Sequence, residues 1–271
     1  MPWEGEPAPA PSDAALRSRA AKNTILGMRN NVPRLLAPQP DADGDRSGVP
    51  SAIAQTVDRS LLRRRAAAQD EVERLVRAAF TLIERTGGLD PRVSDILAEA
   101  GLSNQAFYRH FRSKHELLVA VLDEGIRGLA DYLGTRMAGT SSASDAVRAW
   151  IRGMAAQATD AEGAQATRPF ALARGRLAET FPAEVARSAT QLTAPLRAAL
   201  VRARDAGLMP AVDPAAEAEA LYLLMMGWVE ARLIEGRIPT REEVDRLEAF
   251  AMAGLERAAQ PATTGDEGRA A

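Results

Sequence analysis

The sequence has no cysteine and only two histidines, and both shortages exclude chemistry. Without cysteine the chain cannot form disulfides, thiolate zinc sites, cysteine-ligated iron–sulfur clusters or a thiol redox switch. His110 and His115 are the only imidazoles, so a catalytic triad has few candidates for its base. They also stand five positions apart, which is poor geometry for sharing a metal on one helix. We therefore predict no enzymatic activity, no metal site and no cofactor.

Long apolar runs are missing as well. No stretch approaches the roughly 18 uninterrupted apolar residues of a membrane-spanning helix. The N-terminus opens with proline, glutamate and aspartate rather than with a basic run that leads into a hydrophobic segment. The sequence therefore predicts a cytoplasmic protein with no membrane partner, and its 271 residues are enough to bury a sizeable core.

The overall charge shows no excess of basic residues, since the formal net charge is −2. Net charge is a sum over the whole molecule, however, whereas DNA meets only one face of a protein. Between Ser103 and His115 the chain carries Arg109, Arg112 and Lys114 and no acidic residue. The local charge of this segment therefore suits a nucleic-acid contact.

Proline, glycine and aspartate concentrate in two N-terminal segments, residues 1–15 and 37–50, which we expect to be poorly ordered. Residues 16–36 and 51–66 have the composition of short helices. We predict that residues 1–66 form an N-terminal extension, largely disordered with short helices, and that residues 259–271 form a disordered tail.

From Asp70 onward the apolar spacing is helical. A first core helix ends before Gly87, and Asp90-Pro91 is expected to cap and open a second helix, which stops at Gly101. Ser103 is the expected cap of a short third helix, and Ser113 with Glu116 predicts a capping box for a long fourth one, which runs to about Met137. Further helices are predicted at about 143–159, 167–179, 182–206, 213–236 and 240–258, with no strand pattern.

The predicted fold is therefore all-α. The helices group into a three-helix unit over residues 67–115 and a larger helical unit over residues 116–258.

The third helix suits insertion into the major groove of DNA. Asn104 and Gln105 at its start are the residue types that pair with adenine, and Arg109 can reach guanine or a phosphate. Tyr108, His110 and Lys114 suit phosphate oxygens, whereas we expect Phe107 and Phe111 to be structural.

The segment VSDILAEAGLSNQAFYRHFRSKHELLVAVLDEG resembles the helix-turn-helix signature of the TetR family of transcriptional regulators along its whole length. The resemblance rests on the Ala-Gly-Leu-Ser turn, the Phe-Tyr-Arg-His-Phe helix and the Ser-Lys-x-Glu-Leu-Leu continuation. It implies that DNA is contacted by Ser103, Asn104, Gln105, Tyr108, His110 and Lys114. It also implies that residues 67–115 form a helix-turn-helix DNA-binding domain and that residues 116–258 form a helical domain for effector binding and dimerisation.

The sequence departs from the family pattern at Arg92, where threonine or serine is usual, at Leu97, where alanine is common, and at Phe107, where a smaller aliphatic residue is usual. Arg92 near the helix start can still meet a phosphate, and Asp90-Pro91 can replace the lost cap. The complete predicted DNA-binding set is Arg92, Ser94, Ser103, Asn104, Gln105, Tyr108, Arg109, His110 and Lys114.

The run Arg63-Arg64-Arg65 has two readings at this stage. It is either a solvated charge run or an arm that follows the phosphate backbone beside the first helix.

The helix predicted at 213–236 is apolar on nearly all sides between Ala220 and Val229, so it must be buried on two faces. With the amphipathic helix after Thr240 it resembles the last two helices of TetR-like proteins, which form a four-helix bundle with a twofold mate. The predicted homodimer interface contains Leu221, Leu224, Met225, Trp228, Leu247 and Phe250. The alternative is that this helix is buried entirely within its own subunit.

Large apolar side chains in the C-terminal half predict a cavity for an apolar ligand. The predicted effector pocket contains Trp150, Met154, Phe170, Phe181, Leu196, Met225 and Trp228. The alternative is that these residues are ordinary core.

The leading hypothesis is a ligand-responsive dimeric DNA-binding regulator, a repressor that a small, largely apolar effector releases from a palindromic operator in double-stranded DNA. One alternative is a helical small-molecule-binding or catalytic protein with a vestigial helix-turn-helix. Another is a nonspecific architectural DNA binder.

Overall fold

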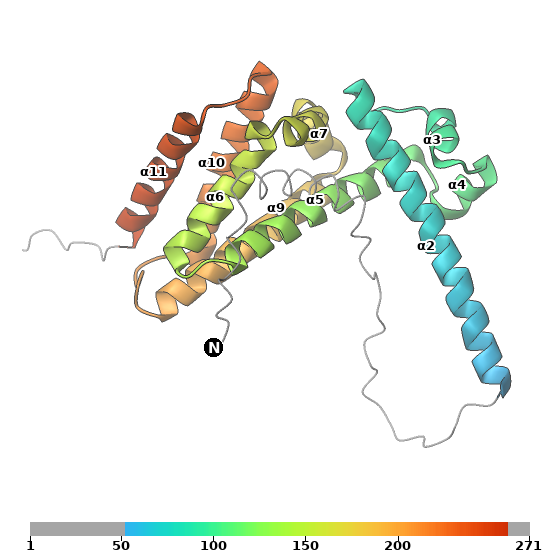
Figure 1. Ribbon diagram of the computed structural model, residues 1–271, viewed down its shortest axis with the longest axis horizontal. Coiled ribbons are helices and arrows are strands. Elements are labelled where there is room, and N and C mark those ends of the chain that lie inside the picture. The colour runs from blue at the N-terminus through green and yellow to red at the C-terminus, as the bar shows by residue number, and fades with distance from the viewer. Residues whose placement is uncertain (1–51, 260–271) are drawn as a thin grey trace, which may run out of the picture.

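The computed structural model describes residues 52–259, and these residues contain α-helices and no strand. Figure 1 shows α2, α3 and α4 at one end of the molecule and α10 and α11 at the other. The helices, with their bounds, are α2 (Ala52–Thr86), α3 (Val93–Ala100), α4 (Asn104–His110), α5 (Lys114–Ala138), α6 (Ala143–Thr159), α7 (Ala161–Leu172), α8 (Arg174–Thr180), α9 (Pro182–Asp205), α10 (Pro214–Glu235) and α11 (Arg241–Ala258). The predicted all-α fold is confirmed.

The first helix differs from the prediction in its extent. The sequence favoured a short helix over 51–66 followed by a separate core helix from Asp70, but α2 runs without a break from Ala52 to Thr86. The intervening residues are alanine, glutamine and aspartate, none of which forces a helix to stop. The predicted boundary between residues 66 and 67 therefore falls inside α2. The expectations for residues 1–51 and 260–271 lie outside the described residues.

A small core joins α2, α3 and α4 to the beginning of α5. Leu75, Ile83, Ile96, Phe107 and Leu117 have no exposed surface and pack together. Because Phe107 supplies the largest of these side chains, α4 is anchored to the domain through its middle.

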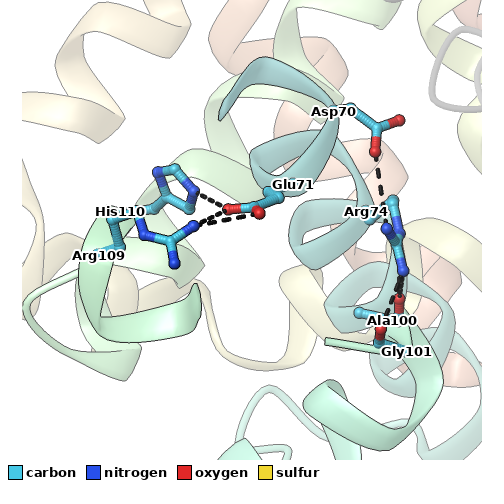
Figure 2. Close-up of polar contacts among 7 residues, drawn as sticks. All are labelled: Asp70, Glu71, Arg74, Ala100, Gly101, Arg109 and His110. Atoms are coloured by element: carbon cyan, nitrogen blue, oxygen red, sulfur yellow. Dashed lines mark hydrogen bonds and ion pairs between the residues drawn. The ribbon is translucent and has the colours of Figure 1, made fainter. Parts of the chain in front are cut away.

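The turn between α3 and α4 is determined locally. Gly101 ends α3 in the left-handed conformation, with φ of 61°, which glycine adopts without a steric penalty. Arg74 of α2 donates hydrogen bonds to the carbonyl oxygens of Ala100 and Gly101, which α3 itself cannot satisfy (Figure 2). α2 therefore fixes the C-terminus of α3.

The predicted cap of α3 is wrong. Arg92 occupies the N-cap position, no side chain caps the helix, and Asp90 instead pairs with Lys114. Two residues separate Asp90 from the first helical residue, so its carboxylate is turned to a partner from another element. Ser103 and Ser113 do cap α4 and α5, because their hydroxyls accept hydrogen bonds from the backbone N–H of Ala106 and Glu116.

The capping box predicted at α5 is only half formed. The carboxylate of Glu116 accepts a hydrogen bond from the backbone N–H of Arg112, the residue before the cap, at 2.7 Å. The Glu116 carboxylate does not accept from the backbone N–H of Ser113, as a full capping box requires. It accepts from the backbone N–H of the preceding residue instead.

The larger domain is built around α6, whose Trp150 is completely buried and donates its indole N–H to the carbonyl oxygen of Leu192 at 3.0 Å. α5, α9 and α10 surround α6, and α5 continues into the smaller domain, where it packs against α2. The long α5 therefore links the two domains, as Figure 1 shows.

The helix predicted at 167–179 is instead two helices. α7 begins earlier because Asp160 caps it, accepting a hydrogen bond from the backbone N–H of Gly163 at 2.9 Å. It ends at Leu172, and α8 starts after Ala173. Pro169 lies within α7 and is buried.

α11 packs against α6 through an ionic cluster. The nearly buried carboxylate of Glu248 contacts Arg148 at 2.8 Å and Arg152 at 2.5 Å, and Arg152 also reaches Asp245 at 2.9 Å. At the start of α11, Thr240 and Glu243 form a full capping box. Hydrogen bonding from Arg237 and from the backbone of Thr240 lowers the pKa of Glu243 to about 2.

Across residues 52–259, every helix is too short or too polar to cross a lipid bilayer.

Candidate nucleic-acid interface and ligand cavity

The recognition helix α4 presents one polar face to solvent. Asn104, Gln105, Tyr108 and Arg109 are exposed, whereas Ala106 and Phe107 are buried. At 100° per residue the four exposed positions span about 140° of the helix surface, so they form a single face. A face of this width can enter the major groove while the opposite side stays in the core.

The start of α3 supplies two more of the predicted residues. Arg92 and Ser94 are exposed, and the Ser94 hydroxyl donates to the carboxylate of Asp95 at 3.2 Å.

Two predicted DNA contacts of α4 also pair with α2. Figure 2 shows Arg109 and His110 converging on Glu71. His110 Nε2 donates to Glu71 Oε2 at 2.6 Å, and Arg109 Nη1 donates to the same oxygen at 2.8 Å. The hydrogen bond from His110, followed by the charge and hydrogen bond of Arg109, lowers the pKa of Glu71. Glu71 therefore ties the C-terminal end of the recognition helix to α2.

The His110 side chain is only 10% exposed, so its surroundings differ from those expected of a free phosphate donor. The Arg109 side chain is 55% exposed and can reach solvent while it holds Glu71. Sequence separation explains why this contact was not predicted, since Glu71 lies 39 residues before His110.

Lys114 also has an acidic partner. Its ammonium pairs with Asp90, which precedes α3, and this hydrogen bond lowers the pKa of the Asp90 carboxyl. The Lys114 side chain is partly buried, whereas the Asp90 side chain is largely exposed. The pair joins the start of α5 to the loop before α3.

The larger domain contains a cavity of about 130 Å³ between α5, α6, α7, α8, α9 and α10. Its walls are mostly apolar, with Leu129, Met154 and Phe170 among them. A second cavity of about 100 Å³ shares much of this wall, including Phe170 and Leu129, and extends towards Phe80 of α2.

Polar groups line the larger cavity at two places. The Thr167 hydroxyl donates to Gln157 Oε1 at 3.0 Å, and Arg174 pairs with Glu230 at 2.6 Å. Sequence reasoning missed all four residues. They lie on four different helices, α6, α7, α8 and α10, and only the packing of these helices brings them to one cavity wall.

Of the seven residues predicted for the pocket, the structure brings Met154 and Phe170 to the cavity wall. Trp150, Leu196 and Met225 instead have no exposed surface and belong to the core of the larger domain. Phe181 precedes α9 and faces the His115 ring at 6.2 Å, while the Trp228 ring lies 5.9 Å from the Arg232 guanidinium. These five side chains were selected for size and apolarity, which do not separate core from cavity wall.

The six residues predicted for the dimer interface are also divided. Leu221 and Met225 are buried within their own subunit, and Leu224, Trp228 and Leu247 pack partly against the same core. Only Phe250 is strongly exposed, at 71%. Leu223 and Ile234 of α10, which the prediction did not include, are also more than half exposed.

Comparison with known proteins identifies the smaller domain. Residues 75–121 match the profile of a family described as bacterial regulatory proteins, tetR family. Among curated proteins the chain has no match.

Solved structures share the fold over about two thirds of this chain. The reduced form of NemR from E. coli is 21% identical with a TM-score of 0.56, and the alignment covers 68% of this chain and 96% of that one. A chain from Rhodococcus sp., described as a TetR-family transcriptional regulator, is 20% identical with a TM-score of 0.56. The alignment covers 70% of this chain and 99% of that one. FadR from Bacillus subtilis, in complex with stearoyl-CoA, is 15% identical with a TM-score of 0.51. The alignment covers 69% of this chain and 97% of that one.

A capped recognition helix held in a three-helix domain, followed by a larger helical domain, defines a helix-turn-helix DNA-binding regulator of transcription. The match of residues 75–121 identifies a DNA-binding domain of the tetR family in this chain, and the chain shares the fold of these solved structures.

Proposed function

We propose that the protein is a dimeric repressor that binds a palindromic operator and is released from it by a compact, largely apolar effector. The observation that carries this proposal is the position of α7. Thr167 and Phe170 of this helix line the apolar cavity, and Pro169 and Leu172 of the same helix line a cleft whose other wall is the loop that leads into the helix-turn-helix.

In the proposed DNA complex, Asn104 and Gln105 read base edges, and Ser103, Tyr108, Arg92 and Ser94 contact the backbone. Their exposure on α4 and at the start of α3 supports these roles. Arg109 and Lys114 are proposed to share their charge between a carboxylate partner and a phosphate, since both retain exposed surface. His110 is proposed to act chiefly through Glu71, by holding the recognition helix in place.

The route from effector to DNA is proposed to pass through α7. Thr167 and Phe170 line the cavity, while Pro169 and Leu172 line a cleft of about 610 Å³ against the loop at residues 86–92. A ligand that displaces Phe170 would therefore move Pro169 and Leu172 and change the shape of the cleft between α7 and this loop. Because α3 follows the loop, the two recognition helices would lose their match to the operator spacing.

The lining of the cavity supports a particular class of effector. Its apolar walls favour hydrocarbon, and the Thr167–Gln157 and Arg174–Glu230 pairs offer hydrogen bonds to one polar end. Pockets for drug-sized ligands occupy roughly 300–1,000 Å³, so a volume of about 130 Å³ favours a compact molecule.

The dimer is proposed to form through the exposed face of α10 and α11. Leu223, Ile234 and Phe250 are apolar and exposed, and a Cβ added at Gly227 or Gly254 would meet nothing within 4 Å. This face lies at the end of the molecule opposite the recognition helix (Figure 1). A twofold axis there would place two recognition helices far apart, as a palindromic operator requires.

The effector mechanism is tested by release from DNA. The operator is first isolated by selecting bound fragments from genomic DNA, and a panel of small alcohols, ketones and carboxylic acids with short apolar chains is then titrated into the labelled complex. We expect at least one compound to raise the operator Kd about tenfold, which corresponds to about 1.4 kcal/mol of coupling. Fluorescence anisotropy measures this change.

A matched pair of variants assigns the effect to the cavity. Thr167→Val removes the hydroxyl that binds Gln157 in the cavity wall, whereas Thr190→Val removes one that binds the backbone of its own helix on the exposed side of α9. We expect only Thr167→Val to shift the effector concentration at half release. An equal response of both variants, or no release by any compound that binds the cavity, would count against the proposal.

The dimer has its own test. Phe250→Asp places a charge on the exposed apolar face of α10 and α11, where a partner would bury it, so we expect monomers in sedimentation velocity and weak operator binding. Leu208→Asp makes the same kind of change on an exposed leucine that follows α9 and should leave the dimer intact. Dimers that persist in Phe250→Asp would show that the interface lies elsewhere.

A further inference from the structure

The N-terminal half of α2 projects beyond the folded domain. We call residues 52–67 the α2 arm. Every side chain that the structure describes in the arm is exposed, and burial begins only at Ala68. Sixteen helical residues extend about 24 Å at 1.5 Å per residue. In Figure 1 the arm points away from the helices of the larger domain.

The charge of the arm is opposite in sign to that of the chain. It carries Arg59, Arg63, Arg64 and Arg65 against a single acid, Asp58, so its net charge is +3, whereas the whole chain carries −2. Within residues 52–259, no carboxylate forms an ion pair with Arg63 or Arg64, in contrast to Arg109 and Lys114 of the recognition region. Arg63 and Arg64 therefore carry positive charge that no carboxylate in the described part of the chain neutralises.

The arm is also held at a fixed angle to the recognition helix. Four residues after the arm ends, Glu71 binds both Arg109 and His110 of α4, and the rest of α2 packs in the core of the domain. Because the arm continues an existing helix, it needs no separate nucleation. A rigid cationic rod in register with the DNA-reading helix is placed to meet the phosphates of the same duplex.

We infer that the α2 arm is a second DNA-binding element, which contacts the phosphate backbone beside the operator. This inference rests on the proposed binding of an operator by α4. Duplex DNA carries one negative charge per about 1.7 Å of axis, so a rod of this length passes many phosphates. The contact adds affinity and carries no base information, because the arginines meet phosphates rather than base edges.

The apolar side chains of the arm suggest a different binding partner, a second copy of the chain. Ile53, Val57 and Leu61 recur every four residues and are exposed, which also suits pairing with a second copy of the chain. The excess of arginine argues against pairing with a second copy, since two parallel or antiparallel arms would bring like charges together.

The test compares two operator fragments with the full-length protein. One is the shortest fragment that is bound specifically, and the other has about ten further base pairs on each side, prepared with two unrelated flank sequences. We expect the long fragment to bind about tenfold more tightly with either flank. We also expect log K to fall more steeply with log salt concentration, by about 2 to 3 per arm for three arginines at about 0.9 each.

Matched variants locate the effect. R59Q/R63Q/R64Q should abolish the advantage of the long fragment and leave binding of the short fragment unchanged. R187Q/R197Q/R202Q removes the same charge from exposed arginines of α9 and should keep the advantage. Circular dichroism reports whether each variant keeps the helix content of the wild type.

Each outcome separates the inference from the proposed function. If the short fragment is bound specifically and the flanks add no affinity, the arm does not bind DNA and the inference is overturned. A gain in affinity from the flanks that survives R59Q/R63Q/R64Q also overturns it. Dimers that dissociate in Val57→Ser/Leu61→Ser, with no gain from flanks, assign the arm to a second copy and also overturn it. Failure of both fragments to bind would instead reject the proposed operator binding.

Discussion

Phe107→Ala is expected to unfold the helix-turn-helix domain and abolish operator binding. Phe107 has no exposed surface and anchors α4 in the core that α2 and α5 share. Truncating a buried phenylalanine costs about 3–5 kcal/mol, because the lost contacts and the remaining cavity both destabilise the fold. A small domain has little stability in reserve, so this loss is enough to populate the unfolded state.

The neighbouring Tyr108 provides the matched control. Its side chain is 59% exposed and meets the Phe107 ring edge-on, with the centroids 5.2 Å apart. We expect Tyr108→Ala to cost about 1 kcal/mol of stability or less, because only this edge contact is lost. Operator affinity should nevertheless fall, since the proposed phosphate contact is removed.

Tyr108→Phe separates the hydroxyl from the ring. It keeps the contact with Phe107 and removes only the proposed donor to a phosphate, so we expect native stability and a roughly tenfold weaker operator complex. Urea unfolding followed by circular dichroism measures the first quantity, and fluorescence anisotropy measures the second. Wild-type affinity in Tyr108→Phe would remove this residue from the interface.

The local features of the fold could be predicted because they depend on neighbouring residues. The caps at Ser103 and Ser113 and the stop at Gly101 involve partners within about five positions, and the structure has all three. The capping box at Thr240 has the same local origin. Helix boundaries fixed by such signals agree with the prediction to within a residue or two.

Contacts between elements could not be predicted in this way. Asp90 is a residue type that often caps helices and stands close before α3, but tertiary packing brings Lys114 close enough to pair with it. His110 looked like a free donor because nothing in its own segment pairs with it. Glu71 becomes its partner only when α2 crosses α4.

The cavity shows the same division. Apolar periodicity indicates which side chains turn inward, but it does not indicate where the packing leaves space. Trp150 fills its surroundings completely, whereas Met154, one turn further along α6, reaches the cavity wall. The difference arises from the arrangement of α7, α9 and α10 around α6, which no local signal specifies.

The readers of the operator sequence are expected to be Asn104 and Gln105. Both are exposed at the N-terminal end of α4, the end that meets base edges when a recognition helix enters the major groove. Asn104→Ala or Gln105→Ala should reduce discrimination between operator and random DNA by about 1–3 kcal/mol, because a bidentate contact with adenine is lost. Binding to random DNA should change little, and parallel titrations with the two DNAs measure the ratio.

Lys114→Ala should weaken operator and random DNA alike, since a phosphate contact carries no sequence information. The pair with Asp90 adds a second effect, because the substitution also leaves an exposed carboxylate beside the DNA. Asp90→Asn alone should therefore strengthen binding to any DNA, and the double variant should bind better than Lys114→Ala. Equal losses on both DNAs for Asn104→Ala, Gln105→Ala and Lys114→Ala would refute the division of roles between base reading and backbone contact.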